Sequence, residues 1–395
     1  SMVLIGLVGK TNVGKSTFFK AATMVDVEIS NRIFTTIRPN EGIGYVTVPC
    51  PCREFGKPCN PNNSKCVNGI RLIPIKLLDV AGLIPGAHEG KGLGNQFLDD
   101  LREAPVLLHV LDISGTTDSE GNPTQGHDPV EDIKFFEDEI DHWYTDIFER
   151  EWARMAKQSE ITKSDFEKQI MSRFSGLGIK KDDIHKALGL SDVDPTSPTK
   201  WSKDDIFRFA KNLREISKPI LIAANKMDLP TSEENLKRVR EEFPEKIIVP
   251  CSADYELALR NASDKGLIRY LPGSNDFEVL KELSQEQKNA LETIRNFLKK
   301  FGSTGIQDCL NKAVFEMMNC IVVYPVEDET HLTDKRGRVL PDAYIVPRGT
   351  TAKDLAYMVH TEIGEKFIGA IDARTKRKIG ADHELKDGDI IKILT

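Results

Sequence analysis

The chain has 395 residues, of which 39% are hydrophobic, and a formal net charge of −7. It is long enough for two or three domains with large cores, and its acidic balance argues against a nucleic-acid-binding surface over the whole molecule, although not against a local basic patch. No run of about 18 apolar residues occurs, so we expect no membrane span. We interpret the apolar N-terminal stretch as a strand and not a secretion signal, and we expect a cytoplasmic protein.

The first predicted strand covers residues 3–8, and the glycine-rich loop "GKTNVGKST" (9–17) follows it. The loop matches the pattern G-x-x-x-x-G-K-[ST] and runs into a helix predicted over 15–22. This order is typical of a phosphate-binding loop, because backbone N–H groups and the helix N-terminus point at the phosphates. The residues predicted to contact nucleotide are Gly9, Asn12, Val13, Gly14, Lys15, Ser16 and Thr17.

Three residues of this loop have separate predicted roles. Lys15 supplies the charge that reaches the outer phosphates, so we also count it as catalytic. The hydroxyl of Ser16 is expected to bind Mg²⁺. Gly14 lets the backbone approach the phosphates without a Cβ atom in the way.

An unusually long connection joins the next two predicted strands, 41–49 and 70–79, and it carries four of the seven cysteines. These are Cys50, Cys52, Cys59 and Cys66, in the irregular spacing C-x-C-x6-C-x6-C. Four thiolates can bind zinc in tetrahedral geometry. Disulfides and free thiols are alternatives that the spacing leaves open.

The stretch "DVAG" (79–82) ends the strand 70–79. At this position Asp79 is expected to hold Mg²⁺ through water, and the N–H of Gly82 to bind the terminal phosphate. Thr36, in "FTTIRPN" (34–40), is predicted to sense the γ-phosphate and to complete the Mg²⁺ site. The alternative is that Thr36 is an ordinary loop hydroxyl.

Further strands are predicted over 105–114, 219–226 and 246–253. Strands that alternate with helical patterns predict an α/β fold with a mostly parallel sheet. Ligands of such sheets bind at the carboxyl ends of the strands. Gly9, Asp79, Asn225 and Ser252 fall at those ends.

The chain between two of these strands is predicted to leave the sheet. A glycine-rich, polar and mobile connection over 112–128 precedes an amphipathic helical pattern. We interpret 129–200 as an inserted helical arm, a hairpin whose aromatic stripe is packed as core. The helix 201–217 then returns to the sheet, with Ser202 and Asp205 as its capping pair.

The stretch "NKMD" (225–228) is expected to select the base. The carboxylate of Asp228 can accept two hydrogen bonds from guanine, whereas adenine would leave it unpaired. Asn225 is predicted to bond the purine edge and to tie back to the glycine-rich loop, while the stem of Lys226 covers the base. The backbone at Ser252 and Ala253 is predicted to reach the guanine O6 atom.

The last part of the chain forms a helical connector and a small mixed α+β domain. The predicted domains are a nucleotide-binding domain over 2–128 and 201–276, the arm over 129–200, the connector over 277–319 and the small domain over 320–395. The strongest basic run of the small domain is "RTKRK" (374–378), which fits either a solvated turn or a contact with RNA phosphates.

The motifs together resemble the Obg/YchF group of P-loop GTPases, in an archaeal-type branch, over nearly the whole chain. The stretches that carry the resemblance are "GKTNVGKSTFF" (9–19), "FTTIRPNEG" (34–42), "LLDVAGLIPGAHEGKGLGNQFLDDLREA" (77–104) and "NKMD". The C-terminal segment resembles the TGS domain, a β-grasp module. The resemblance implies a GTPase that acts around ribosomes, with the TGS-like domain as the contact to ribosome or RNA. No contact with membrane or DNA is expected.

The resemblance also bears on the nucleotide and on its hydrolysis. Some YchF relatives have an altered form of the base-recognition motif, which is "NKMD" in this chain, and favour ATP. This chain keeps the motif intact, so GTP is expected. Leu83 stands where other GTPases place a catalytic glutamine, which predicts slow hydrolysis. Asn12 occupies the position that binds K⁺ in related GTPases, or else it only shapes its turn. His88 can approach the phosphate, or it is simply solvated. The alternative function is a housekeeping hydrolase whose TGS-like domain binds a small-molecule regulator.

Overall fold

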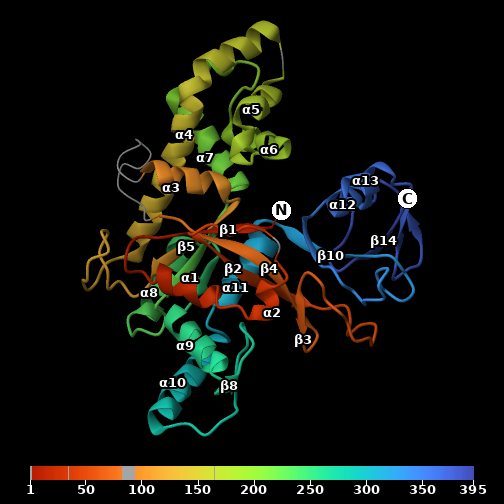
Figure 1. The fold of residues 1–395 in the computed structure, drawn as a ribbon. Coiled ribbons are helices and arrows are strands. Elements are labelled where there is room, and N and C mark those ends of the chain that lie inside the picture. Colours follow the sequence, from red (N-terminus) through yellow and green to blue (C-terminus); the bar gives the residue numbers. More distant parts are fainter. Residues whose placement is uncertain (1, 34, 82–93, 164) are drawn as a thin grey trace. The chain divides into compact units, whose positions relative to one another are not determined.

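Figure 1 shows a computed structural model of the chain, which describes residues 2–33, 35–81, 94–163 and 165–395. Its contacts divide the chain into two compact units. The first unit consists of the N-terminus up to Val3, Ala22–Lys76 and Leu310–Thr395, and the second of Leu4–Ala21 and Leu77–Cys309. Within the described ranges, no helix has the length and apolar character needed to cross a membrane.

A parallel sheet forms the centre of the second unit. Its neighbouring strands are, in order, the end of β4 (Ile70–Asp79), β1 (Leu4–Val8), β5 (Val106–Asp112), β6 (Ile220–Asn225) and β7 (Ile248–Pro250). Every residue of β5 is buried, as expected for a parallel strand that is covered on both faces. The strands predicted in this region are confirmed, and most are slightly shorter than predicted.

Helices lie around this sheet (Figure 1). They are α1 (Lys15–Ala22), α3 (Gly94–Glu103), α7 (Lys203–Ser217), α8 (Ser232–Glu242), α9 (Ala253–Asp264) and α10 (Gln285–Phe301). In the sequence, α1, α3, α7 and α8 lie between the strands of the sheet, and α9 and α10 follow its last strand. Helix α7 begins with the predicted capping box, in which Ser202 and Asp205 each accept a hydrogen bond from the backbone of the other. Between α9 and α10 lies a short antiparallel pair, β8 (Ile268–Arg269) and β9 (Glu278–Val279), that the sequence analysis did not predict.

The inserted arm consists of more than a hairpin. Its elements are α4 (Pro129–Thr162), α5 (Phe166–Phe174), the 3-10 turn η2 (Ser175–Leu177), α6 (Lys181–Ser191) and the 3-10 turn η3 (Pro198–Lys200). The second helix of the expected hairpin is interrupted at Gly178, whose φ of +75° ends the helical stretch before α6. Trp152, Phe166 and Trp201 stack on one another and on Phe209 of α7. The aromatic stripe is therefore core, as predicted.

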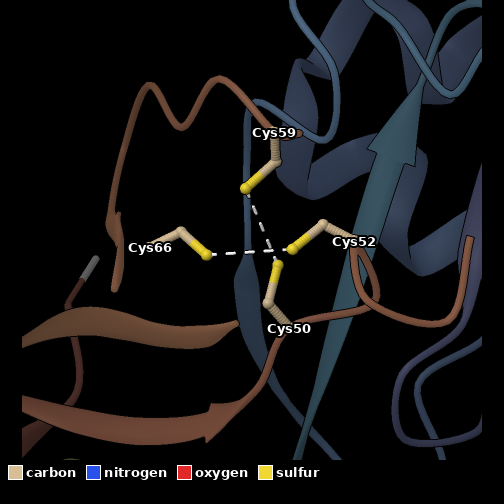
Figure 2. Close-up of side chains that lie close together, drawn as sticks. All are labelled: Cys50, Cys52, Cys59 and Cys66. Atoms are coloured by element: carbon tan, nitrogen blue, oxygen red, sulfur yellow. Dashed lines mark hydrogen bonds between the residues drawn. The ribbon is translucent and has the colours of Figure 1, made fainter. Parts of the chain in front are cut away.

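In the first unit, β2 (Glu41–Pro49) and β3 (Lys65–Val67) both lie beside β4. The strands predicted at 41–49 and 70–79 are confirmed to the residue. The chain between β2 and β4 carries the four cysteines, three in the connection before β3 and Cys66 in β3, and their sulfur atoms point toward one another (Figure 2). The short helix α2 (Val27–Ser30) and the π-helical turn η4 (Ala313–Met317) also belong to this unit, and α11 (Ile306–Lys312) begins in the second unit and ends in the first.

The C-terminal part of the first unit is a small α+β domain, as predicted. Its five strands lie in the order β11 (Tyr344–Pro347), β10 (Cys320–Val326), β14 (Ile390–Leu394), β12 (Gly369–Asp372) and β13 (Lys378–Ile379). Helix α12 (Ala352–Val359) starts at a capping box of Thr351 and Asp354, and α13 (Thr361–Glu365) follows it. The domain limits given above, at residues 128, 200, 276 and 319, stay a prediction.

Candidate functional site

An open cavity of about 750 Å³ lies beside the loop between β1 and α1. Its volume is in the range of small-molecule sites. Its lining comes from the glycine-rich loop, the end of β4, Lys226 and Asp254. Asn12 and Gly14 have φ values of +64° and +90°, which turn the loop backbone. At Gly9, an added Cβ atom would lie 2.8 Å from the carbonyl oxygen of Val110, so only glycine fits there.

The phosphate end of the cavity holds one lysine and one aspartate. Nζ of Lys15 lies 3.0 Å from Oδ1 of Asp79 and also donates to the carbonyl of Val80. Oδ1 of Asp79 is buried and, apart from this ion pair with Lys15, accepts no hydrogen bond from the described part of the chain. A buried carboxylate oxygen with spare acceptor capacity suits a divalent cation, and Ser16 lines the same cavity. The residues present therefore fit Mg²⁺ between Ser16 and Asp79.

The "NKMD" segment is tied to the glycine-rich loop by side-chain hydrogen bonds. Nδ2 of Asn225 donates to the carbonyl of Val13 at 2.9 Å, and Nζ of Lys226 donates to the carbonyl of Asn12 at 2.7 Å. Asn225 is 3% exposed, and its Oδ1 accepts a hydrogen bond from the N–H of Ala253. The predicted tie between this segment and the loop is present.

The carboxylate expected to select the base is held in place from the neighbouring strand. Oγ of Ser252 donates to Oδ1 of Asp228 at 2.9 Å. The second oxygen of Asp228 has no hydrogen bond from the described residues. The N–H of Ala253, expected to reach a guanine O6 atom, points at Asn225 in this structure.

The segment 113–128, after β5, is bound to the glycine-rich loop by hydrogen bonds. Lys10 donates to Asp132 at 2.8 Å and to the carbonyl of Thr117 at 3.2 Å, and His127 lies 3.0 Å from the same carboxylate. Nδ2 of Asn12 donates to the carbonyl of Gly121 at 2.8 Å. This hydrogen-bonded arrangement does not fit the mobile connection expected from composition.

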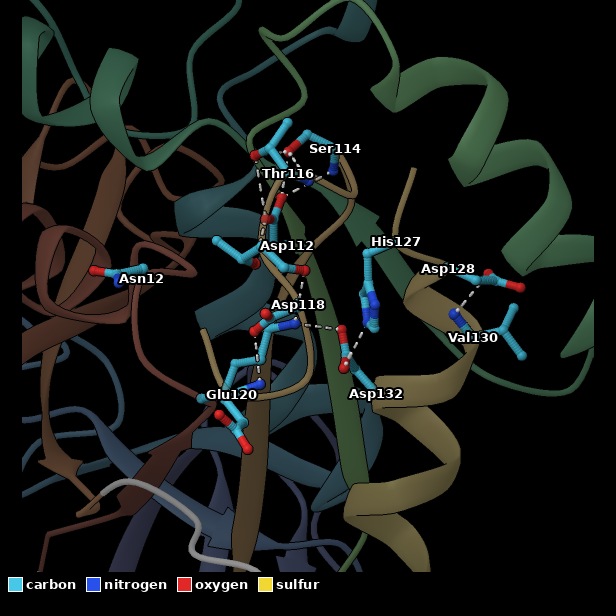
Figure 3. Close-up of polar contacts among 12 residues, drawn as sticks. Asn12, Asp112, Ser114, Thr116, Asp118, Glu120, His127, Asp128, Val130 and Asp132 are labelled. Carbon is cyan, nitrogen blue, oxygen red and sulfur yellow. Dashed lines mark hydrogen bonds and ion pairs between the residues drawn. The ribbon is translucent and has the colours of Figure 1, made fainter. Parts of the chain in front are cut away.

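Asp112, at the end of β5, organises the start of this segment (Figure 3). Its carboxylate accepts from the N–H of Ser114 at 3.0 Å and from the hydroxyl of Thr117 at 2.6 Å, and Nζ of Lys226 lies 3.5 Å away. Sequence reasoning missed Asp112, Lys10 and Asp132. The position of Asp112 at the end of a predicted strand was the signal that could have found it.

Several predicted site residues are not brought to this cavity by the described structure. Thr36 belongs to the first unit, where it is exposed and its carbonyl accepts a hydrogen bond from Lys76 at 3.3 Å. Gly82, Leu83 and His88 lie outside the described residues. Their predicted roles stay predictions.

The four cysteines between β2 and β4 form a second site. Their sulfur atoms all lie within 4.8 Å of one another. Burial raises the pKa of the Cys50 thiol, but the charge and hydrogen bond of Arg71 outweigh burial and hold that pKa below its ordinary value. Burial and the neighbouring Cys50 raise the pKa of Cys52 to about 11. Arg71 thus favours negative charge at one end of the cluster.

The basic run 374–378 forms the turn between β12 and β13. Arg374 is engaged within the chain, since its guanidinium binds the carboxylate of Glu54 and the carbonyl of Gly388. Lys376 donates to the carbonyl of Glu329. Arg377 and Lys378 are exposed, so they are the residues of the run whose side chains are available to a partner.

Three family models match successive parts of the chain. "50S ribosome-binding GTPase" matches residues 4–143, "Obg-like GTPase YGR210-like, G4 motif-containing domain" matches 223–328, and "TGS domain" matches 331–395. The three matches follow the order of the glycine-rich loop, the base-selecting segment and the small C-terminal domain.

Individual relatives resemble the chain over its full length. A GTP-binding protein of Methanocaldococcus jannaschii is 53% identical over 396 residues, which cover 100% of this chain and 99% of that protein. The crystal structure of a GTP-binding protein from Pyrococcus horikoshii OT3 is similar with a TM-score of 0.80 and 41% identity, and covers 100% of both chains. The ribosome-binding ATPase YchF of Pasteurella multocida is 28% identical over 411 residues, 98% of this chain and 97% of its own.

Proposed function

The chain belongs to the Obg/YchF group of P-loop GTP-binding proteins, and on that premise we propose that it hydrolyses GTP in preference to ATP, with Mg²⁺, and acts on the ribosome. The observation that carries the nucleotide part is the arrangement of Asp228, held by Ser252 beside the Asn225 link to the glycine-rich loop. The names of the relatives differ on this point, since some are called GTP-binding proteins and others ATPases.

The preference for guanine follows from hydrogen-bond chemistry. The free oxygen of Asp228 and the one held by Ser252 are both acceptors, and guanine offers two donors, N1–H and the 2-amino group. Adenine has neither donor at these positions, so a partly buried carboxylate would lose its solvation without gaining a partner. A loss of one such pair lowers affinity by about 100-fold or more.

Calorimetry with GTP, ATP and xanthosine triphosphate tests the base assignment. Wild-type protein should bind GTP at least 100-fold more tightly than ATP. Asp228→Asn should weaken GTP and favour xanthosine triphosphate, whose 2-oxo group accepts a hydrogen bond. Asp264→Asn, at the exposed end of α9, is the matched control. Equal affinities of the wild type for GTP and ATP would overturn the guanine assignment.

On the phosphate side, the chain supplies positive charge, backbone donors and a cation site. Lys15 is the group we expect to leave Asp79 and bind the outer phosphates. Mg²⁺, held by Ser16 and Asp79, would supply a Lewis acid that neutralises charge on the phosphates. Asn225 and Lys226 keep the glycine-rich loop in position by binding its carbonyls. Thr36, Gly82 and His88 are further candidates for the terminal phosphate.

We expect turnover to be slow, because Leu83 cannot orient a water molecule. Potassium would bind the side-chain oxygen Oδ1 of Asn12, because a cation is bound by oxygen; the Asn12 amide nitrogen donates to Gly121 and its main-chain carbonyl accepts from Lys226. Single-turnover hydrolysis should be faster in K⁺ than in Na⁺, and Asn12→Ala should remove the difference. Equal rates in the two salts would exclude potassium.

The ribosomal part is supported by the matching family description and by the names of the bacterial relatives. A ribosome-binding protein acts in the cytoplasm, and we propose that location. Replacing Arg377 and Lys378 together with alanine should weaken co-sedimentation with ribosomes and reduce its dependence on salt, because phosphate contacts release counterions. Unchanged co-sedimentation would exclude this turn as the contact.

The alternative is a hydrolase whose TGS domain binds a small-molecule regulator. In that case the GTP-loaded protein would not co-sediment with ribosomes at any salt concentration. Comparing protein loaded with GDP and with a non-hydrolysable GTP analogue separates the two proposals. Ribosome binding that depends on the nucleotide favours the first.

A further inference from the structure

The four thiols between β2 and β4 surround one centre (Figure 2). All four sulfur atoms lie within 4.8 Å of one another, and the pairs Cys50–Cys59 and Cys52–Cys66 are each 3.9 Å apart. A tetrahedral site with Zn–S bonds of about 2.3 Å places its sulfur atoms about 3.8 Å apart, whereas a disulfide bond is only about 2.05 Å long. The observed distances fit four ligands of a single ion.

A buried cation beside the thiols is the second observation. Arg71 is 0% exposed, and its guanidinium contacts a hydroxyl, a thiol and a carbonyl, with no carboxylate of the described residues among these partners. Its Nη2 lies 3.4 Å from Sγ of Cys50, and its Nε has no hydrogen-bond partner among the described residues. An unpaired buried charge is costly. A zinc ion with four thiolates carries a net charge of −2, which would supply the missing counter-charge.

We propose that Cys50, Cys52, Cys59 and Cys66 bind one structural zinc ion, and that this ion holds the β2–β3 connection against the C-terminal domain. A site closed by four protein thiolates leaves no open position, as in structural zinc sites. A [4Fe–4S] cluster fits less well, because its thiolates bind different iron atoms and would lie further apart. The proposal does not depend on the identity of the nucleotide.

The connection pairs with the C-terminal domain through three asparagines. The N–H of Asn60 donates to the carbonyl of Val339 at 2.8 Å, and the Asn60 side chain accepts from the N–H of Val339 at 3.1 Å. Asn63 exchanges two hydrogen bonds of 2.9 Å with the backbone of Ala343. The N–H of Asn62 donates to the carbonyl of Pro341 at 2.6 Å.

Arg71 joins the same surface from β4. Its Nη2 donates to the carbonyl of Leu340 at 2.9 Å, and its guanidinium lies 5.4 Å from the ring centre of Tyr324 on β10. Arg71 therefore contacts both a thiol of the cluster and two residues of the C-terminal domain. A metal that fixes the thiols would also fix the position of Arg71.

The order of the residues explains why a metal matters to this pairing. Cys59 directly precedes Asn60, and Cys66 lies in β3, so the three asparagines lie between two ligands. Apart from β3, no helix or strand holds the connection. Tethering both ends of the segment lowers the entropy that it must lose on docking.

Metal analysis of the full-length protein, purified without chelator, tests the zinc assignment directly. We expect about one zinc per chain, and tetrahedral thiolate absorption in the visible range after replacement by Co²⁺. Cys59→Ser should lose the zinc, whereas Cys320→Ala, at a buried cysteine outside the cluster, should keep it. Iron in place of zinc would overturn the assignment. So would a disulfide within the cluster, or a folded, metal-free protein in which all four thiols of the cluster react as free thiols.

Hydrogen exchange of the full-length protein separates the docking role from metal binding. In Cys59→Ser, the amides of Asn60, Val339 and Ala343 should exchange at least 10-fold faster than in the wild type, while amides of β5 stay unchanged. Asn63→Ala keeps all four thiols, so it should retain zinc and still show faster exchange at Ala343. If zinc loss leaves exchange at these amides unchanged, the ion does not hold the domain.

Discussion

The cavity beside the glycine-rich loop is lined by that loop, by the end of β4 at residues 79–81, and by Lys226 and Asp254, which lie shortly after β6 and β7. The cysteine site instead depends on partners far away in the chain, such as Asn63 and Ala343, which are 280 positions apart. In the first region, the polar residues lie where the sheet places any loop that follows a parallel strand. The second region has little regular structure, so side-chain hydrogen bonds and the thiols hold its residues in place.

This difference predicts how each region fails. The cavity depends on backbone geometry, so it should be sensitive to a single added methyl group and insensitive to metal chelators. The cysteine site depends on a few polar side chains around a buried cation, so it should be sensitive to loss of a charge or a ligand. The predictions below test this contrast.

Gly14→Ala should have the largest effect. An added Cβ atom would lie 2.2 Å from Nδ2 of Asn225, and the φ of +90° at this position strains any other residue. Both the glycine-rich loop and its link to the base-selecting segment would be displaced, so we expect nucleotide affinity to fall by about 100-fold or more. Calorimetry with GTP measures the change.

The control for this variant is Gly189→Ala in α6, where an added Cβ atom would meet nothing within 4 Å. It should leave nucleotide binding intact and stabilise the helix by up to about 1 kcal/mol. If Gly14→Ala binds GTP like the wild type, the cavity is more adaptable than its backbone geometry indicates.

The same contrast explains what could be predicted from sequence. The strands 41–49 and 70–79 and the helix 15–22 match the structure to the residue, because their apolar patterns and flanking turns are local signals. The motifs of the cavity follow such strands, so their convergence could be predicted.

The missed features share a different cause. Arg71 reads as one polar residue in a strand, yet it is buried because it meets Cys50 and Leu340. The segment 113–128 looks mobile by composition, but Asp112 and Lys10 bind it through contacts that no periodicity reveals. Long-range hydrogen bonds between loops leave no pattern in a single sequence.

Arg71→Met should have the next largest effect, and it tests the cysteine site. It removes the cation beside Cys50 and leaves the carbonyl of Leu340 and the hydroxyl of Ser64 without their partner. We expect the free energy of unfolding to fall by about 3 kcal/mol and zinc to be released at lower chelator concentration. Arg336→Met, at an exposed arginine, should change neither quantity. A stable variant with tightly held zinc would show that Arg71 does not balance the thiolates.

Mild acid should separate the two regions in another way. Burial and the charges of Lys10 and Lys246 lower the pKa of His109, in β5, to about 3. Since the unfolded-state pKa is about 6.5, the unfolded chain binds the proton between these values, and stability is lost as the pH falls below 6.5. The loss between pH 7 and pH 5 should be about 2 kcal/mol.

Denaturant unfolding at several pH values, followed by a probe in the sheet of the second unit, measures this loss. His109→Gln removes the titrating group, so its stability should vary less between pH 7 and pH 5, even if it is lower at pH 7 because contact with Phe136 is lost. An unchanged pH dependence in this variant would mean that other groups set the acid response.

The smallest effect is expected at the rim of the docked C-terminal domain. Arg374 binds Glu54 through two nitrogen atoms, with Nη2 2.8 Å from Oε2, and the guanidinium holds the pKa of the Glu54 carboxyl below its usual value. The two side chains are 29% and 54% exposed, so solvent screens the pair. A double-mutant cycle with Arg374→Ala and Glu54→Ala should give a coupling of about 0.5–1 kcal/mol that declines in high salt.

Zinc content should stay the same in all four proteins of this cycle, because neither residue touches a thiol of the cluster. A coupling above about 2 kcal/mol would mean that exposed charges, and not the buried cation and the asparagines, hold the domain. It would also change how Arg374 bears on ribosome binding. With a weak pair, any loss of co-sedimentation in Arg374→Ala reports a contact with the ribosome, whereas with a strong pair it reports release of the domain from the cysteine site.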